Sequence, residues 1–168
     1  MKISILTVSD RSFRNVRPDL SGPALREFCL SEGWEVIQYQ VVPDDKDKIE
    51  KVLTDWSDSN KSDIILTTGG TGFSPRDVTP EATENVIHRR APGLPEAMRQ
   101  SSLKITPHAM LSRATAGIRG HTLIINLPGS PKAAIENLTT IKSVLNHAID
   151  LLVESPGSEQ GHQYSKRP

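Results

Sequence analysis

The sequence feature that most restricts the fold is an apolar segment that runs directly into a cluster of glycines. Residues 63–68 read Asp-Ile-Ile-Leu-Thr-Thr, and residues 69–72 read Gly-Gly-Thr-Gly. A short apolar run that ends in turn residues is typical of a strand buried on both faces, as in a parallel sheet covered by helices. The segment therefore predicts an α/β fold in which a buried strand leads into a glycine-rich loop.

Alternating patterns along the rest of the chain support this fold class. We predict strands over residues 2–8, 34–42, 63–68, 114–118 and 121–126, and helices over residues 22–33, 46–59, 79–90, 95–105 and 132–154. This order predicts a three-layer sandwich with a mostly parallel, doubly wound sheet, joined by one antiparallel strand through the turn at residues 119–120. We expect one domain over residues 1–154 and a disordered, polar tail over residues 155–168.

Several residues carry local helix signals. The Thr79-Pro80-Glu81 sequence predicts a helix that begins with Thr79 as a hydroxyl N-cap. The basic residues 88–90 are interpreted as the solvated end of that helix, since cations suit a last turn. Asp45 and Ser130 are predicted to be N-caps of the helices that follow them.

Composition argues against several kinds of partner and compartment. The 168 residues include 20 basic and 20 acidic side chains, and this balance argues against nucleic acid or an anionic membrane as the main partner. Cys29 is the only cysteine, so we expect a buried, inert thiol and a reducing compartment. The sequence has no recognisable signal peptide and no apolar run of roughly 20 residues. We therefore predict a soluble, cytoplasmic protein.

Polar or glycine-rich residues follow four of the predicted strands, at residues 9–10, 43–45, 69–72 and 128–130. In open α/β sheets, ligands bind outside the carboxyl ends of the strands. Gly69, Gly70 and Gly72 are predicted to take positive φ and to expose successive N–H groups to a phosphate, helped by the hydroxyls of Thr68 and Thr71. A tight turn would explain one or two of these glycines. The loop matches neither a Walker motif nor Gly-x-Gly-x-x-Gly.

Asp44 and Asp77 are predicted to lie at the same edge of the sheet as the glycine loop. Carboxylates would repel a phosphate unless a cation lay between them, and Mg²⁺ favours one or two carboxylates with phosphate oxygens and water. For Asp44, a turn or cap role is the alternative. For Asp77, the alternatives are an ion pair with Arg76 and a bond to a backbone N–H. None of the five histidines has the spacing of a metal ligand.

Two long segments carry a family resemblance: Thr-Thr-Gly-Gly-Thr-Gly at residues 67–72 and Pro-Arg-Asp-Val-Thr-Pro-Glu-Ala-Thr at residues 75–83. Together they resemble the signature of the Mog/MoaB molybdenum-cofactor biosynthesis proteins. The resemblance extends through residues 8–11, 21–22, 111–113, 117–120 and 124–130, and covers residues 2 to about 153. The chain is also similar to the G domain of gephyrin and to its plant counterpart.

This resemblance implies molybdopterin adenylyltransferase activity, in which Mg-ATP and molybdopterin give adenylyl-molybdopterin and pyrophosphate. It implies a homotrimer and, as a partner, the molybdenum-insertion enzyme of the same pathway. Asp44 and Asp77 match the two essential acidic positions. The nucleotide- and pterin-binding positions that follow are Ser9, Asp10, Thr68, Gly69, Gly70, Thr71, Gly72, Ser112, Pro128, Gly129, Ser130 and Lys132. Ser112, Ser130 and either Lys132 or Arg113 are expected to contact the pterin phosphate.

Other functions are possible on the same fold. The alternative is a non-catalytic carrier or scaffold that binds molybdopterin, against which the presence of Asp44 and Asp77 argues. The molybdenum-insertion and CinA proteins contain a similar domain but have several domains, for which this chain lacks the length. An ordinary oxidoreductase is disfavoured because the dinucleotide fingerprint is missing.

Overall fold

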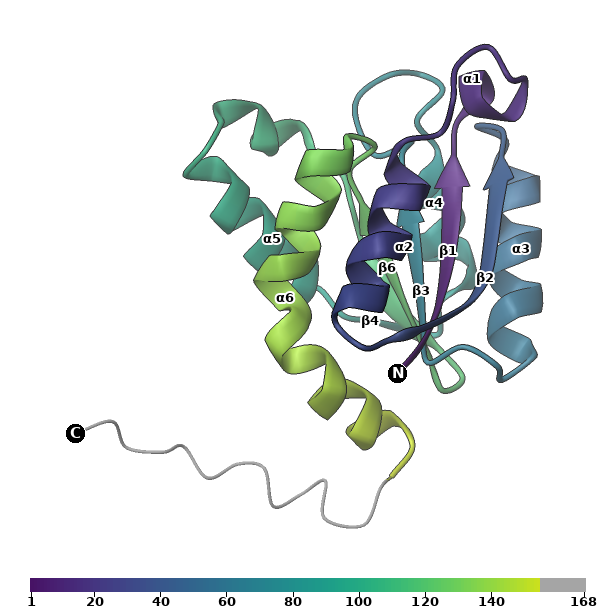
Figure 1. Cartoon of the computed structure of the whole chain (residues 1–168), viewed down its shortest axis with the longest axis vertical. Helices are drawn as coiled ribbons and strands as arrows, with labels where there is room; N and C mark the ends of the chain where they lie inside the picture. Colours follow the sequence, from purple (N-terminus) through teal and green to yellow (C-terminus); the bar gives the residue numbers. More distant parts are fainter. Residues whose placement is uncertain (155–168) are drawn as a thin grey trace.

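The computed structural model describes residues 1–154 as a six-stranded sheet with helices on both faces (Figure 1). The strands are β1 (Lys2–Val8), β2 (Glu35–Val42), β3 (Ile64–Thr68), β4 (Arg89–Arg90), β5 (Ala116–Arg119) and β6 (Thr122–Leu127). The helices are α1 (Asp10–Phe13), α2 (Ser21–Ser31), α3 (Lys46–Asp58), α4 (Thr79–Val86), α5 (Gly93–Leu103), the 3-10 helix η1 (Pro107–Leu111) and α6 (Pro131–Leu152). The predicted α/β sandwich is confirmed, whereas the predicted tail, residues 155–168, lies outside the described residues.

The sheet has the strand order β2-β1-β3-β6-β5-β4. The pairs β1/β2, β1/β3 and β3/β6 are parallel, while β5 is antiparallel to both of its neighbours. Within residues 1–154, β5 is thus the one strand that runs against the others, as predicted. The register places Thr68 beside Thr7 on one side and beside Leu127 on the other. The carboxyl ends of β1, β3 and β6 therefore reach the same edge of the sheet.

Side chains of the central strands alternate between two apolar cores. Ile3 and Ile5 of β1 belong to the core beneath α2, α5 and α6, whereas Leu6 and Val8 belong to the core beneath α3 and α4. The residues of β3 and β6 divide in the same way. Because both faces of these strands are covered, their side chains are mostly apolar, as expected of parallel strands. Cys29 is fully buried in the first core, which confirms the predicted buried cysteine, and burial raises the pKa of its thiol to about 12.

A buried polar network joins the sheet to α4 next to the carboxyl edge. Asn126 has no exposed surface, and its Nδ2 donates to Thr67 Oγ1 at 2.9 Å and to Thr83 Oγ1 at 2.8 Å. Its Oδ1 accepts the N–H of Thr115 at 3.2 Å. A buried amide with its partners in place resists displacement, since any movement would leave polar groups unpaired. The network holds β3, β6 and α4 in one arrangement directly below the glycine loop.

The region around residues 87–90 differs from the prediction. Helix α4 ends at Val86, and Arg89 and Arg90 form an edge strand opposite Ile118 and Gly117. A Cβ on Gly117 would lie 2.4 Å from Ile87 Cδ1 and 2.7 Å from the carbonyl oxygen of Arg89. Because Gly117 has no side chain, residues 87–89 have room to lie against β5 and to pair with it. The interpretation of residues 88–90 as a helix end is wrong, because pairing with β5 replaces the last helical turn.

Two short helices and one cap also differ from the prediction. Helices α1 and η1 lie outside the predicted helices, and each is five residues long or shorter. Thr79 is the first residue of α4 rather than its N-cap, and its hydroxyl donates to the carbonyl of Gly69 at 2.9 Å. The predicted Asp45 cap is confirmed, since Asp45 accepts the N–H of Lys48.

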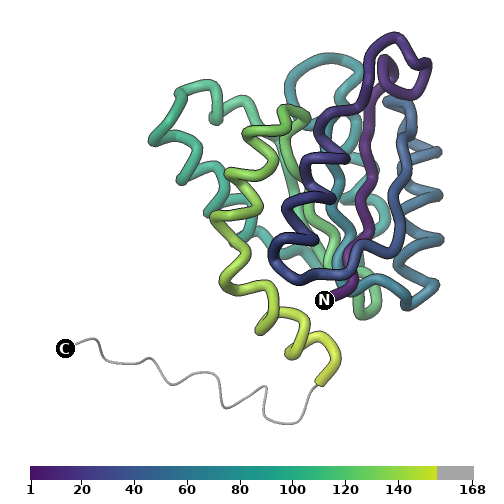
Figure 2. The backbone as a smooth tube through the Cα atoms, in the orientation of Figure 1, coloured from purple at the N-terminus to yellow at the C-terminus, as the bar shows by residue number. Residues whose placement is uncertain are grey.

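Helix α6 is the longest helix of the described chain, and its last turns extend past the amino ends of the strands (Figure 2). Its N-terminus lies at the opposite end, next to the carboxyl edge of β6 (Figure 1). No helix within residues 1–154 combines the length and the apolar character needed to cross a membrane.

Candidate functional site

A cleft of about 450 Å³ opens at the carboxyl edge of the sheet. We call it the main cleft. It is lined by the loops that follow β1, β2, β3 and β6. The first of these, residues 9–21, leads from β1 to α2, and we call it the arm. Eight of the residues predicted for the site line it: Ser9, Asp10, Asp44, Thr68, Gly69, Gly70, Asp77 and Gly129. The four loops thus meet where the sequence predicted that they would.

The glycine loop needs its glycines for two different reasons. Gly69 and Gly70 have φ angles of +98° and +62°, which side chains rarely tolerate. A Cβ on Gly69 would lie 2.3 Å from the carbonyl oxygen of Val8. Gly72 does not have positive φ, contrary to the prediction, but a Cβ there would lie 2.9 Å from Asp77 Oδ2. Gly129 also lies against the loop, because a Cβ there would lie 3.1 Å from the Cα of Gly69.

The N–H groups of this region lack acceptors. Within residues 1–154, nothing accepts a hydrogen bond from the N–H groups of Gly70, Thr71, Gly72 or Phe73. The same holds for the N–H groups of residues 129–130 at the start of α6. Backbone donors in a folded protein are almost always satisfied by protein, water or a ligand. Two adjacent groups of free donors make this edge of the sheet suitable for binding anions.

The side-chain carboxylates of Asp10 and Asp44 each accept a hydrogen bond from the backbone N–H of the other residue. The N–H of Asp10 donates to Asp44 Oδ2 at 2.7 Å, and the N–H of Asp44 donates to Asp10 Oδ1 at 3.3 Å. Arg76 closes the group by donating its Nε and Nη2 to Asp10 Oδ2 at 3.1 and 2.9 Å. Asp77 accepts the N–H of Ser74 at 3.0 Å, one of the two alternatives left open by the sequence. Arg76 pairs with Asp10, so the other alternative, an ion pair between Arg76 and Asp77, is not formed.

The pKa values of Asp44 and Asp10, two carboxyl groups of the main cleft, are shifted in opposite directions. Burial raises the pKa of Asp44, and the nearby charges of Asp10 and Asp77 raise it further, against the N–H of Asp10. Burial also opposes ionisation of Asp10, but the hydrogen bonds and charge of Arg76 outweigh it and hold the pKa of Asp10 below its ordinary value. The negative charge of Asp44 is therefore less well compensated than that of Asp10, although Arg76 acts on both.

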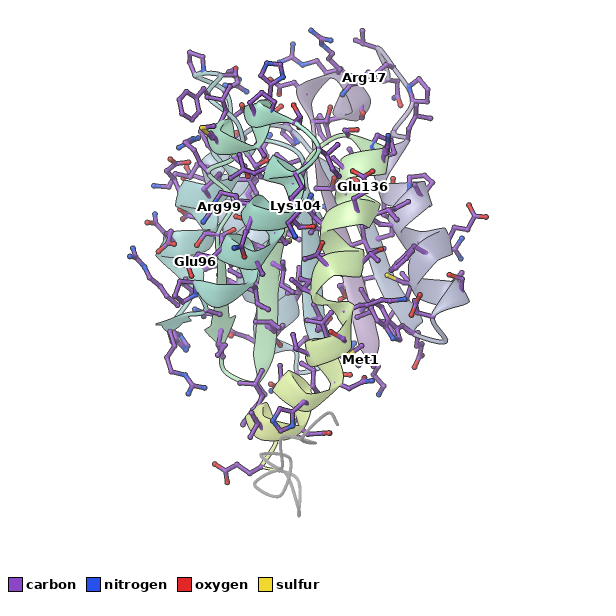
Figure 3. All side chains as sticks on the ribbon, turned by 90° about the vertical axis from the view of Figure 1, so that its left-hand side faces the viewer. Met1, Arg17, Glu96, Arg99, Lys104 and Glu136 are labelled. Carbon is purple, nitrogen blue, oxygen red and sulfur yellow. The ribbon has the colours of Figure 1, made fainter. Side chains whose placement is uncertain are left out.

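A second, mainly apolar pocket of about 290 Å³ lies on the other side of the glycine loop. We call it the side pocket. Four predicted site residues line it rather than the main cleft: Thr71, Gly72, Ser112 and Pro128. Arg99 of α5 and Glu136 of α6 also line it, and Figure 3 shows them on the two helices that border the pocket. The predicted site is thus divided between two pockets that meet at residues 68–72 and 128–131.

The remaining predicted residues occupy more exposed positions. Ser130 and Lys132 are exposed at the start of α6, and Lys132 Nζ lies 3.9 Å from Glu136 Oε1. Ser130 is the N-cap of α6, but its side chain makes no capping hydrogen bond. The Thr68 hydroxyl was predicted to donate to a phosphate, but it donates to the carbonyl of Pro128 at 2.7 Å. Thr68 instead ties the loop after β3 to the loop after β6.

Sequence reasoning missed three residues of the main cleft. Asp19 lines it and accepts hydrogen bonds from the N–H of Ser21 at 2.9 Å and from the Tyr39 hydroxyl at 2.6 Å. Arg11 and Arg17 also line it, and neither pairs with a side chain of residues 1–154. Figure 3 shows Arg17 at the end of the molecule where the arm lies. The only available signal was the polar, arginine-rich composition of the arm, which is also common in ordinary loops.

Comparisons with known proteins assign most of the chain to one family model. Residues 4–147 match the model described as a probable molybdopterin binding domain. The chain is 43% identical over 153 residues to a Helicobacter pylori protein named molybdopterin adenylyltransferase, an alignment that covers 90% of this chain and 87% of the relative. It is 45% identical over 166 residues to gephyrin of Dictyostelium discoideum. That alignment covers 93% of this chain but only 23% of gephyrin.

Solved structures with similar sequences have the same fold. The molybdopterin biosynthesis enzyme MoaB from Thermus thermophilus is 50% identical and superposes with a TM-score of 0.86, covering 92% of this chain and 98% of that one. The Mog protein from Mycobacterium ulcerans is 35% identical with a TM-score of 0.85, covering 92% of this chain and 97% of that one. These proteins match the described sheet and helices over nearly their full length.

Proposed function

The chain belongs to the family of molybdopterin-binding domains, and from this premise we propose that it is a molybdopterin adenylyltransferase. It transfers AMP from ATP to the terminal phosphate of molybdopterin, and pyrophosphate leaves. The identity of 43% to a similarly sized relative of that name supports this activity. The single structural observation that carries it is the row of free N–H groups beside the carboxylates of the main cleft.

The glycine loop and the start of α6 hold the phosphates of the two substrates in this proposal. The N–H groups of Gly70, Thr71 and Gly72 have no acceptor within residues 1–154, and neither do those of residues 129–130. Arg11 and Arg17 add positive charge that no described side chain neutralises. The reaction joins two anions, so fixed donors and cations lower the barrier by offsetting charge and by aligning the reactants.

Asp44 and Asp77 are proposed to hold Mg²⁺. Asp44 Oδ2 accepts one hydrogen bond and so does Asp77 Oδ2, while Oδ1 of each residue accepts none from residues 1–154. Burial raises the pKa of Asp44, and the charges of Asp10 and Asp77 raise it further; a bound cation would offset this repulsion. Residues 1–154 contain no group of three or more His, Cys, Asp or Glu side chains able to hold a metal. Two carboxylates with phosphate oxygens and water suit Mg²⁺, which when bound neutralises phosphate charge.

The transfer needs no general base in this scheme. An oxygen of the pterin phosphate, already ionised, forms a bond to the α-phosphorus of ATP, and the bond from that phosphorus to the bridging oxygen of pyrophosphate breaks. Ser112, Ser130 and Lys132 are proposed to contact the pterin phosphate, since they lie around the junction of the two pockets and the start of α6. The remaining predicted residues line the two pockets. Ser9, Asp10 and Gly129 are among those in the main cleft, and Pro128 is among those in the side pocket.

We also propose that the protein is a cytoplasmic homotrimer that passes its product to the molybdenum-insertion enzyme of the same pathway. A reduced, fully buried Cys29 is consistent with a reducing compartment. Exposed apolar side chains on and near η1, among them Ile105 and Met110, suit contact with further copies of the chain. Sedimentation equilibrium at several protein concentrations measures the assembly directly, and a monomer at all of them would contradict the trimer.

The test of the proposed activity is to incubate the protein with molybdopterin and Mg-ATP and to assay pyrophosphate and adenylylated pterin. Asp77→Asn serves as the control because it keeps the shape of the side chain and removes its charge. We expect product from the wild type and none from the variant. Tight pterin binding without product from the wild type would instead indicate the carrier or scaffold function.

A further inference from the structure

Arg113 contacts the glycine loop through both its backbone and its side chain. It lies two residues beyond the end of η1, and its backbone N–H donates to the carbonyl of Thr71 at 2.9 Å. Its Nε donates to the carbonyl of Gly72 at 2.7 Å, and its Nη2 donates to the carbonyl of Asp77. Its Nη1 pairs with Glu81 in the first turn of α4. One guanidinium group therefore joins both ends of the segment 72–77 to a helix.

The same segment fixes the position of the Asp77 carboxylate. Asp77 Oδ2 accepts the N–H of Ser74 at 3.0 Å, and the N–H of Asp77 donates to the carbonyl of Ser74 at 2.9 Å. The absence of a Cβ on Gly72 leaves room for this carboxylate, which would otherwise meet it at 2.9 Å. The distance between the backbones of Gly72 and Asp77 thus decides where the Asp77 oxygens lie, and Arg113 bridges those two carbonyls.

Arg113 also determines which way the loop donors face. In a planar trans peptide, the N–H of one residue points opposite to the carbonyl of the residue before it. The carbonyls of Thr71 and Gly72 point toward Arg113. The N–H groups of Gly72 and Phe73 therefore point away from Arg113, and they are among the donors without an acceptor in residues 1–154.

We propose that Arg113 is a positioning residue of the transferase, which sets the Asp77 carboxylate and the loop N–H groups without touching a substrate. This differs from the sequence-based expectation of a contact with the pterin phosphate, because all three nitrogens of the guanidinium group have protein partners. The inference rests on the proposed function. A lysine would keep the charge but lacks the planar fork that reaches two carbonyls and a carboxylate together.

The test compares Arg113→Lys with Arg119→Lys as a matched control. Arg119 also donates to a carboxylate, that of Asp58, and to a backbone carbonyl, that of Val86, but it lies on β5 beside the amino end of β6. Hydrogen exchange of the backbone amides is measured first, because it requires no substrate. Within residues 72–77, the amides that donate a hydrogen bond are those of Ser74, Arg76 and Asp77. We expect their exchange to accelerate about tenfold or more in Arg113→Lys only, since local contacts govern local opening.

Binding is measured second, with Mn²⁺ and a non-hydrolysable ATP analogue that carries a methylene between its α- and β-phosphorus atoms. Electron paramagnetic resonance reports the bound Mn²⁺. We expect Arg113→Lys to bind Mn²⁺ in the presence of the analogue about tenfold more weakly, because small displacements of ligand groups are costly. Arg119→Lys should bind like the wild type.

Wild-type exchange at the amides of Ser74, Arg76 and Asp77 in Arg113→Lys would overturn the proposal, as would acceleration spread evenly over the chain. Wild-type binding of Mn²⁺ with the analogue by Arg113→Lys would overturn it as well. Failure of the proposed function gives a different result: the wild type itself makes no adenylylated pterin. The exchange data then still report whether Arg113 holds the segment 72–77.

Discussion

At Gly70 the backbone has a φ of +62°, and a Cβ there would lie 2.4 Å from Thr79 Oγ1 and 3.2 Å from Asp44 Oδ1. Gly120 has a similar φ of +56°, but a Cβ there would meet nothing within 4 Å. We predict that Gly120→Ala costs about 1 kcal/mol of unfolding free energy, the cost of the left-handed conformation alone. Gly70→Ala should cost about 3 kcal/mol, because Thr79 must also move. Urea unfolding of both variants measures the difference, and equal losses would show that the contact with Thr79 can relax freely.

Asp44 should lower the stability of the protein at neutral pH. Its folded-state pKa lies above the ordinary value of 3.8, so the folded protein binds this proton more tightly than the unfolded chain does. Stability is therefore lost as pH rises from that ordinary value through the raised pKa. Asp44→Asn cannot ionise and keeps an oxygen for the N–H of Asp10. With a chelator present, we predict that the variant is more stable than the wild type at pH 7.

The advantage of Asp44→Asn should disappear toward about pH 3, where the carboxyl of the wild type is protonated in both states. Urea unfolding at the two pH values provides the measurement. A difference in stability that is the same at both would mean that the substitution acts through packing and not through charge.

Among the secondary-structure elements, α3 has adjacent residues with separate tasks at its start. Asp45 caps the helix by accepting the N–H of Lys48 at 3.2 Å, whereas Asp44 faces the main cleft. We predict that Asp45→Ala costs about 1 kcal/mol of unfolding free energy, the usual effect of losing an N-cap, and leaves turnover near the wild-type value. Asp44→Asn should have the opposite pattern, with turnover lost and the fold retained. Loss of turnover in Asp45→Ala at a temperature where it is fully folded would contradict this separation.

The sequence predicted the elements that are set by local patterns. The apolar strands β1, β3 and β6 and the amphipathic helix α3 lie where periodicity placed them, and the four loops meet as the parallel sheet requires. Elements that depend on distant residues were missed. β4 exists because Gly117, far along the chain, leaves space for residues 87–89, and local helix signals cannot report such a neighbour.

The same distinction applies to the candidate site. Asp44, Asp77 and the glycines could be predicted because their positions after strands determine their place in an α/β fold. The partners of Arg76 and Arg113 could not, because each depends on where a loop from another part of the chain folds back. Arg76 lies 66 residues from Asp10, and Arg113 lies 41 residues from Gly72. Side-chain direction at such contacts follows from the assembled loops rather than from sequence spacing.

The whole molecule should respond to nucleotide, because the main cleft combines loops from most of the chain. A ligand that binds only the folded state adds about 2.7 kcal/mol at a concentration of 100 Kd. For a domain of this size, each kcal/mol raises Tm by about 2–4 °C. We therefore predict that the methylene ATP analogue with Mg²⁺ raises the Tm of the wild type by about 5–10 °C under those conditions.

Without Mg²⁺ the rise in Tm should be much smaller, because the unneutralised carboxylates of Asp44 and Asp77 then repel the phosphates. Removal of one of these charges weakens that repulsion, so Asp77→Asn should show a smaller difference between the magnesium and chelator conditions than the wild type shows. Differential scanning calorimetry of both proteins, with Mg²⁺ and with chelator, gives four values that test this pattern. An equal rise in Tm for the wild type in both conditions would mean that nucleotide binds away from the two carboxylates. The proposed metal site would then have to be abandoned, while the free N–H groups of the glycine loop would remain as the phosphate contact.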